Sequence, residues 1–290
     1  MDTLSKTYAG SATIGAAPIA LVPTTDYLRP PDLIDEVVSA AEVKAALPVV
    51  DLLVLGFLSG AFLGIATALA LTVKAQAVPA IAAAVIFPVG FVLLALLGLE
   101  LATGSFAVLP VGVVARQVSW SGLGRNWLWV YIGNLAGCLF LAGLFYIALT
   151  SFGHTNGGPV AVQIKTTAIA KTTAYQNLGA TGWWLAVVKG ILANWMVTVG
   201  VVMAFVSRST IAKIAAMWLP IMTLYALGLE HSIVNMFVIP AAMFLKAPIS
   251  GASWWMWNQI PVTIGNIVGG AVLTGLALYF TYGRQPRTTA

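Results

Sequence analysis

Six apolar stretches constrain the fold of this chain more than any other feature of its sequence. They lie at about 49–73, 80–115, 127–150, 181–206, 211–246 and 258–282. A helix needs about 20 apolar residues to cross the roughly 30 Å hydrocarbon core of a bilayer. Only 8% of the 290 residues are charged and 60% are hydrophobic, too few charges for a water-soluble fold to cover its core. We therefore expect an all-α membrane protein with six transmembrane helices.

The distribution of Lys and Arg predicts the orientation. With the N-terminus placed inside, the inner side collects more than twice as many basic residues as the outer side, which follows the positive-inside rule. Both termini are then cytoplasmic in the cell (inner) membrane, and 151–180, rich in Gly, Thr and Asn, is an outward loop. The inner residues are Lys6, Arg29, Lys44, Arg116, Arg125, Arg208, Lys213, Arg284 and Arg287, and the outer ones are Lys74, Lys165, Lys171 and Lys246.

Three regions follow from this reading. Residues 1–48 form a cytoplasmic N-terminal segment, 49–282 the six-helix transmembrane domain, and 283–290 a cytoplasmic tail. Within the first region, the segment from Pro30 to Leu47 has acids early and Lys44 late. This pattern is typical of a short amphipathic helix lying on the membrane surface.

The two halves of the transmembrane region resemble each other at a nearly constant offset. Ile-Gly-Asn-Leu-Ala-Gly at 132–137 matches Ile-Gly-Asn-Ile-Val-Gly at 264–269, and Gly-Leu-Glu at 98–100 matches 228–230. Each half holds three stretches, an odd number, so the second half enters the membrane from the opposite side. This is an inverted 3+3 repeat, an architecture of transporters and channels. The paired glycines, four residues apart, let helices pack closely.

The second and fifth stretches carry polar residues at their centres. An acid at membrane depth costs at least about 2.5–3.5 kcal/mol on insertion scales, so it persists only with partners or a polar cavity. We expect both helices to be broken here, with freed N–H groups of the following half-helices attracting an anion. The supporting residues are Glu100 and Gly104 at the first break, and Glu230 and Asn235 at the second. The two glutamates are expected to accept hydrogen bonds from the freed backbone donors.

His231 is the one histidine expected inside a span, and it follows Glu230 directly. Histidine can be neutral or charged near physiological pH. Thr103 lies in the corresponding polar centre of the other half. A hydrogen-bonded structural histidine and a proton-sharing histidine in a substrate pathway both remain open on this evidence.

Four segments around these residues resemble the formate/nitrite transporter family. They are Glu-Leu-Ala-Thr-Gly at 100–104, Gly-Ile-Leu-Ala-Asn-Trp at 190–195, Glu-His-Ser-Ile-Val-Asn-Met at 230–236 and Ile-Pro-Val-Thr-Ile-Gly-Asn at 260–266. With the span pattern they cover about 45–282. The resemblance implies an aquaporin-like protomer with one pore, five protomers around a symmetry axis, and a small monovalent anion, formate first, as substrate.

The resemblance also implies roles for individual residues. Thr103 would lie on the loop that breaks the second span and face His231 in the middle of the pore. One apolar constriction would contain Phe87 and Phe91, and Leu224 would contribute to the other. The polar stretch between them would be lined by Asn194 and Asn266, and an outer-loop lysine, Lys171 in preference to Lys165, would serve the mouth.

Other classes of membrane protein fit less well. Anchoring two haems needs more histidines than His154 and His231, and no phosphate-binding Gly-rich loop, His-x-x-x-His pair or Gly-x-Ser-x-Gly elbow occurs. We expect no enzyme activity, cofactor, metal or nucleic-acid partner. A neutral-solute, aquaporin-like channel remains an alternative, although its paired Asn-Pro-Ala breaks are absent. Nitrite and hydrosulfide remain alternatives to formate, and channel and proton-coupled carrier are both open.

Overall fold

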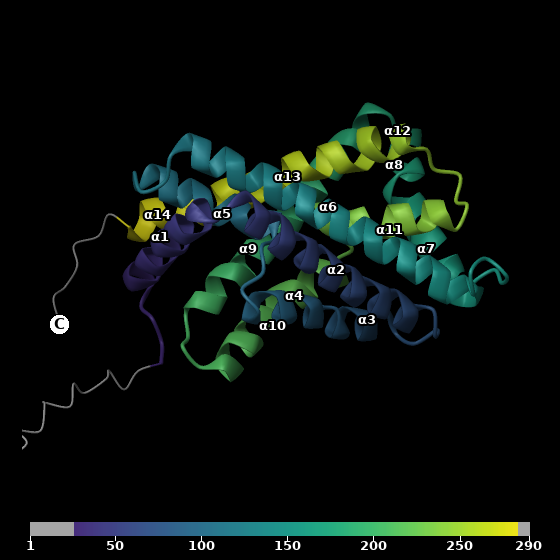
Figure 1. Cartoon of the computed structure of the whole chain (residues 1–290), viewed down its shortest axis with the longest axis horizontal. Coiled ribbons are helices and arrows are strands. Elements are labelled where there is room, and N and C mark those ends of the chain that lie inside the picture. The colour runs from purple at the N-terminus through teal and green to yellow at the C-terminus, as the bar shows by residue number, and fades with distance from the viewer. Residues whose placement is uncertain (1–25, 284–290) are drawn as a thin grey trace, which may run out of the picture.

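The computed structural model describes residues 26–283, and all secondary-structure elements in that range are helices (Figure 1). An isolated bridge between Tyr27 and Ser207 is the one β-type pairing recorded there. Residues 1–25 and 284–290, which fall in the predicted N-terminal segment and tail, lie outside the described residues. The expectation of an all-α fold is confirmed.

Four helical stretches in the described range are long and apolar enough to cross a membrane. They correspond to the first, third, fourth and sixth apolar stretches of the sequence. The last of them is a composite helix in which two π-helical segments interrupt the α-helix. They are α2 (Val49–Lys74), α6 (Trp120–Thr150), α9 (Ala180–Phe205), and the run α12 (Gly251–Trp254), η1 (Trp255–Gln259), α13 (Ile260–Gly270), η2 (Ala271–Leu276) and α14 (Ala277–Tyr282).

The second and fifth apolar stretches are each divided into shorter helices. In the second, non-helical residues 97–101 separate α4 from α5, and in the fifth, residues 227–231 separate α10 from α11. Gly98 and Gly228 begin these turns with φ of 65° and 62°, a left-handed backbone conformation that glycine adopts without strain. The helices are α3 (Ala80–Ile86), α4 (Pro88–Leu96), α5 (Ala102–Val114), α10 (Thr210–Ala226) and α11 (Ser232–Phe244).

Glycine sets the distance between the long helices. α2 packs along α6, and α9 packs along α13. A Cβ atom at Gly137 would overlap the backbone oxygen of Phe57, and one at Gly269 would overlap that of Ile191. The matched glycines therefore have the close-packing role expected from their spacing.

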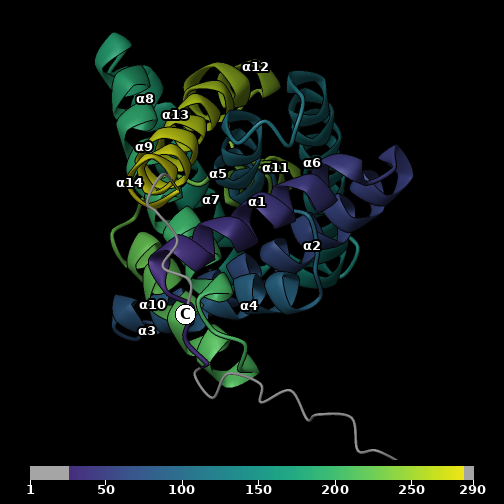
Figure 2. The ribbon, with the colours of Figure 1, turned by 90° about the vertical axis from the view of Figure 1, so that its left-hand side faces the viewer.

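The predicted amphipathic segment forms α1 (Pro30–Ala46), which begins with two prolines in its first turn. Its apolar side buries Leu33, Ile34, Val37 and Ala41, and the helix contacts α5, α6 and α14. Figure 2 shows α1 lying across the end of the molecule, over the helices behind it. The apolar side of α1 is thus covered by the protein itself rather than left free for lipid.

The loop at 151–180, which is expected to face outward, contains two helices that its composition did not predict. α7 (Gly158–Lys171) and α8 (Thr173–Asn177) follow α6. α7 buries Ala161, Ile164 and Ala168, spaced three and four residues apart, and packs against α11 and α2. Its many polar residues concealed this short apolar stripe.

Candidate functional site

An asparagine holds each of the two turns that divide the apolar stretches. At the first turn, Asn134 of α6 donates from Nδ2 to the backbone oxygens of Gly56 and Glu100, at 2.8 and 2.9 Å. The N–H of Ala102, the first residue of α5, donates to Asn134 Oδ1 at 2.9 Å. One buried side chain thereby satisfies backbone groups on both sides of the turn.

Asn266 of α13 does the same at the second turn. Its Nδ2 donates to the backbone oxygens of Gly190 and Glu230, at 2.8 and 3.0 Å. The N–H of Ser232, the first residue of α11, donates to Asn266 Oδ1 at 2.8 Å. Asn134 was absent from the predicted site, although the matched Ile-Gly-Asn sequences of the two halves contained the signal for it.

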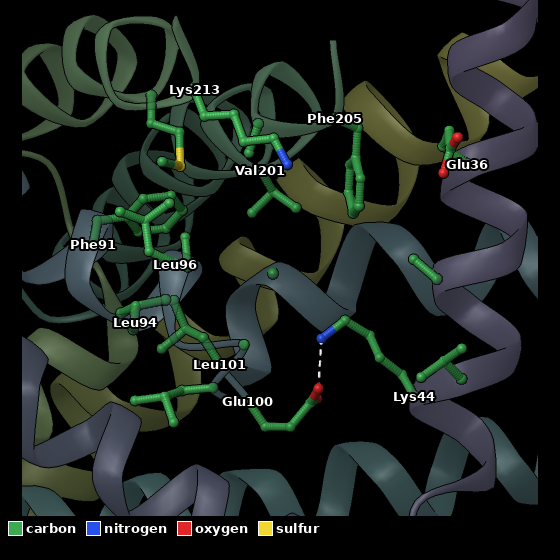
Figure 3. Close-up of a pocket in the computed structure, with 18 of the residues that line it drawn as sticks. Glu36, Lys44, Phe91, Leu94, Leu96, Glu100, Leu101, Val201, Phe205 and Lys213 are labelled. Carbon is green, nitrogen blue, oxygen red and sulfur yellow. Dashed lines mark hydrogen bonds and ion pairs between the residues drawn. The ribbon is translucent and has the colours of Figure 1, made fainter. Parts of the chain in front are cut away.

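Glu100, at the first turn, has side-chain partners. Its Oε1 lies 2.6 Å from Nζ of Lys44 on α1, as drawn in Figure 3. Ser105 Oγ and Asn126 Nδ2 donate to its other oxygen at 3.4 and 3.5 Å. The side chains of the glutamate and the lysine are only 4% and 21% exposed, so each charge depends on the other for compensation.

Glu230, at the second turn, has an equivalent set. Nζ of Lys171 on α7 lies 2.8 Å from its Oε2, and the Tyr175 hydroxyl donates to its Oε1 at 2.8 Å. Asn235 and Asn258 donate to Oε2 at 2.8 and 3.3 Å. Burial, and then the nearby carboxylate, raise the pKa of Tyr175, which keeps this hydroxyl a donor.

These contacts correct the expectation for the glutamates. Both carboxylates bind side-chain donors, and the freed backbone N–H groups of Ala102 and Ser232 bind asparagine oxygens instead. The neutral amide can both donate and accept, so it suits a turn that leaves an N–H and a C=O together. Of the two candidate loop lysines, Lys171 is the one that contacts the second turn. Lys165 forms no ion pair within the described range.

Thr103 and His231 are in direct contact. Thr103 Oγ1 lies 3.0 Å from His231 Nε2, and both side chains are buried. The N–H of Val234 donates to His231 Nδ1 at 3.2 Å, so Nδ1 carries no hydrogen in this arrangement. A neutral ring then has its hydrogen on Nε2 and donates it to the threonine oxygen, which leaves the threonine hydroxyl hydrogen available to another acceptor.

Two cavities lie near the Thr103–His231 pair. The larger, of about 630 Å³, is lined by Lys44, Phe91, Glu100 and Gly104 among others (Figure 3). The smaller, of about 100 Å³, is lined by Lys171 and His231 together with apolar residues that include Phe87 and Leu224.

The two phenylalanines therefore do not share a cavity. Phe87 lies with Leu224 in the smaller one, and Phe91 lines the larger. Four residues along a helix correspond to a rise of about 6 Å, enough for the two rings to line different cavities. Phe87 and Leu224 thus line one cavity together, and the two apolar constrictions expected from the sequence stay a prediction.

Asn194 and Asn266 also differ from their expected position. Neither lines either of these two cavities, and both are fully buried. Asn194 Nδ2 donates to the backbone oxygens of Thr103 and Asn266, at 3.0 and 2.6 Å. Its Nδ2 thus ties the start of α5 to α13, whereas its buried Oδ1 has no hydrogen-bond partner in the described part of the chain.

Within residues 26–283, no group of three His, Cys, Asp or Glu side chains gathers in a way that could hold an ion. The two polar clusters instead combine one acid and one base with neutral amides, which is the composition of a structural support.

Residues 31–280 match the sequence model of the family described as formate/nitrite transporter. The chain is 32% identical to the probable formate transporter of Methanothermobacter thermautotrophicus, over 90% of this chain and 99% of that protein. Its fold resembles a solved FNT family ion channel with a TM-score of 0.75 at 28% identity, covering 88% of this chain and 99% of the other. A pentameric formate channel with formate bound gives a TM-score of 0.65 at 28% identity, over 81% and 97%.

Proposed function

This chain belongs to the formate/nitrite transporter family, and we propose that this multi-pass membrane protein conducts formate along a path that runs from one cavity to the other past Thr103 and His231. The observation that carries the proposal is the 3.0 Å contact between these two side chains. Each stands beside a turn that divides an apolar stretch, and they come from opposite halves of the chain. A buried donor pair at this position can receive an anion that has lost its water.

The proposed architecture is an aquaporin-like protomer of six spans in an inverted 3+3 repeat, with the second and fifth helices broken. The equivalent hydrogen bonds of Asn134 and Asn266 support it, because the same side chain in each half holds the same backbone groups. We place 49–282 in the membrane as the channel domain, with 1–48 and the tail at 283–290 on the cytoplasmic side of the cell (inner) membrane. The resemblance to a solved pentameric channel supports a homopentamer.

The passage of the anion begins with the loss of its bound water. Apolar side chains on either side of the centre, Phe91 in one cavity and Phe87 with Leu224 in the other, remove water from the ion. Placing an uncompensated charge among apolar side chains costs free energy. The N-terminal turns of α5 and α11 present partial positive charge that reduces this cost.

His231 then shares a proton with the anion, after its Nδ1 has taken up a proton from water and released the N–H of Val234. Formate leaves the centre either as the neutral acid or as an anion paired with imidazolium, and both routes couple transport to pH. Thr103 orients the carboxylate, because its hydroxyl hydrogen is free while its oxygen accepts the histidine hydrogen. Glu100 and Glu230, with Gly104 and Asn235, support the turns, so they affect transport through the positions of the other two side chains.

The test is formate flux in proteoliposomes as a function of pH. His231→Asn is expected to change both the flux and its pH dependence, and Thr103→Val is expected to slow the flux. His154→Asn is the matched control, since His154 lies in an exposed loop. If His231→Asn transports formate with the pH profile of the unmodified protein, the proton-sharing step is wrong.

Competition among anions separates the remaining substrates. Nitrite and hydrosulfide are also small monovalent anions of weak acids, and the same apolar residues and histidine serve them. The anion that inhibits formate flux at the lowest concentration is the preferred one. Glycerol or water flux without anion flux would instead support a neutral-solute channel.

A further inference from the structure

The larger cavity contains two lysines with different electrostatic surroundings. Lys44 is paired with Glu100, whose side chain is 4% exposed. Lys213 of α10 lines the same cavity and forms no ion pair with any residue in the described range. Figure 3 shows its side chain reaching into the cavity near Val201 and Phe205, away from the Lys44–Glu100 pair.

The smaller cavity repeats this arrangement. Lys171 is paired with Glu230, and Lys74, at the end of α2, lines the same cavity with an exposed side chain. Within residues 26–283, Lys74 too is without an ion-pair partner. Each mouth of the proposed path thus has one lysine in an ion pair and one lysine without an ion-pair partner.

Paired and unpaired lysines act differently on an approaching anion. A close Lys–Glu pair has no net charge, so its field falls off within a short distance. An uncompensated ammonium at the wall of a cleft raises the local concentration of anions and is weakened by salt. We propose that Lys213 at one mouth and Lys74 at the other capture the substrate anion, while Lys44 and Lys171 hold the helix turns. This rests on the proposed function.

Acidic groups near Lys213 set the net charge of its mouth. Glu36 of α1 is exposed and lines the same cavity. Asp26 is the other acid close enough to sense Lys213. Its pKa is lowered chiefly by the Ser207 hydroxyl and in smaller part by backbone N–H groups and Lys213. Besides Glu100, which is paired with Lys44, Glu36 is the other acid that lines this cavity.

The test uses formate uptake against formate concentration in right-side-out and inside-out vesicles at low salt. Lys213→Gln is expected to raise the half-saturation concentration about three-fold from its own side, with the maximal rate unchanged. This is the size of effect that one charge has in water-filled surroundings. Lys74→Gln is expected to do the same from the opposite side. Glu36→Gln should lower the value, and Lys213→Arg should leave it unchanged.

Salt and a control variant identify the cause. At about 1 M salt the Debye length falls to about 3 Å, so the differences are expected to disappear. Arg29→Gln makes the same charge change at an exposed residue that lines neither cavity.

Unchanged half-saturation in Lys213→Gln, Lys74→Gln and Glu36→Gln would overturn the capture role. So would a lowered maximal rate with no change in half-saturation. An unmodified protein that moves no anion would instead refute the proposed function, which keeps the two failures distinct. Glu36→Gln, which alters an exposed side chain, preserves the test if a lysine variant fails to fold.

Discussion

Replacing Asn134 by alanine removes the side chain that holds the first helix turn. The substitution abolishes three hydrogen bonds, two donated by Nδ2 and one accepted by Oδ1. Two of the freed partners, the N–H of Ala102 and the C=O of Glu100, are left in a buried region without the amide. The third, the C=O of Gly56, lies inside α2 and is expected to keep its helical hydrogen bond.

Two stranded groups set the expected loss of stability. A buried donor or acceptor without a partner costs about 1–3 kcal/mol, so Asn134→Ala should lower the free energy of unfolding by about 2–6 kcal/mol. The other half of the chain gives an independent replicate. Asn266→Ala strands the N–H of Ser232 and the C=O of Glu230, and the same loss is expected.

The assay is unfolding by SDS in mixed micelles, followed by circular dichroism. Asn156→Ala is the matched control. Its Oδ1 accepts from the N–H of Gly158 at 3.0 Å in an exposed loop, where water can replace the lost partner. Its cost should stay below about 1 kcal/mol.

A result within about 1 kcal/mol of the unmodified protein for Asn134→Ala would refute this reasoning. It would mean that water or a rearranged turn satisfies the two backbone groups. A large loss for Asn134→Ala combined with none for Asn266→Ala would contradict the equivalence of the two turns and weaken the case for the repeat.

Three further predictions concern other parts of the fold. Glu100→Gln leaves its partly buried lysine partner uncompensated and should cost about 3 kcal/mol in the same unfolding assay, the lower end of the range for a buried pair. Gly137→Ala should prevent α2 from packing on α6 and greatly reduce the yield of folded protein, whereas Gly143→Ala, with open space at its Cβ position, should not. Ionised Asp26 stabilises the attachment of 26–28, because its pKa is lowered from 3.8, chiefly by a serine hydroxyl; this stabilisation is lost as pH falls through the lowered value. Faster amide exchange at Leu28 below about pH 4, absent in Asp26→Asn, would show it.

The positions of the helices followed from hydropathy because a bilayer demands long apolar segments. The second stretch, expected at about 80–115, contains helices from Ala80 to Val114, and the expected amphipathic helix appears as Pro30–Ala46. The helix Gly158–Lys171 did not follow. Its apolar stripe is three residues wide among polar neighbours, and it gains its stability from α11 and α2, which a local pattern cannot reveal.

The candidate site was predicted in part for a similar reason. Thr103 and His231 were expected to meet, and they are in contact at 3.0 Å. Asn134 and Lys44 were missed. They correspond to Asn266 and Lys171 in the other half, but they lie outside the polar centres of the second and fifth stretches, where the site was sought. The distribution of Phe87 and Phe91 between two cavities depends on the tilt and depth of one helix, which composition does not specify.

The order in which the partners of each turn occur along the chain bears on biosynthesis. Lys44 precedes Glu100 by 56 residues and Lys171 precedes Glu230 by 59, so each acid emerges from the ribosome after its counter-ion. The asparagines come later, 32 residues after Ala102 and 34 after Ser232. During synthesis the charge partner of each turn is therefore available before the asparagine that binds its backbone. The hydrogen bonds of each turn can be completed only after the helix that follows it has been made.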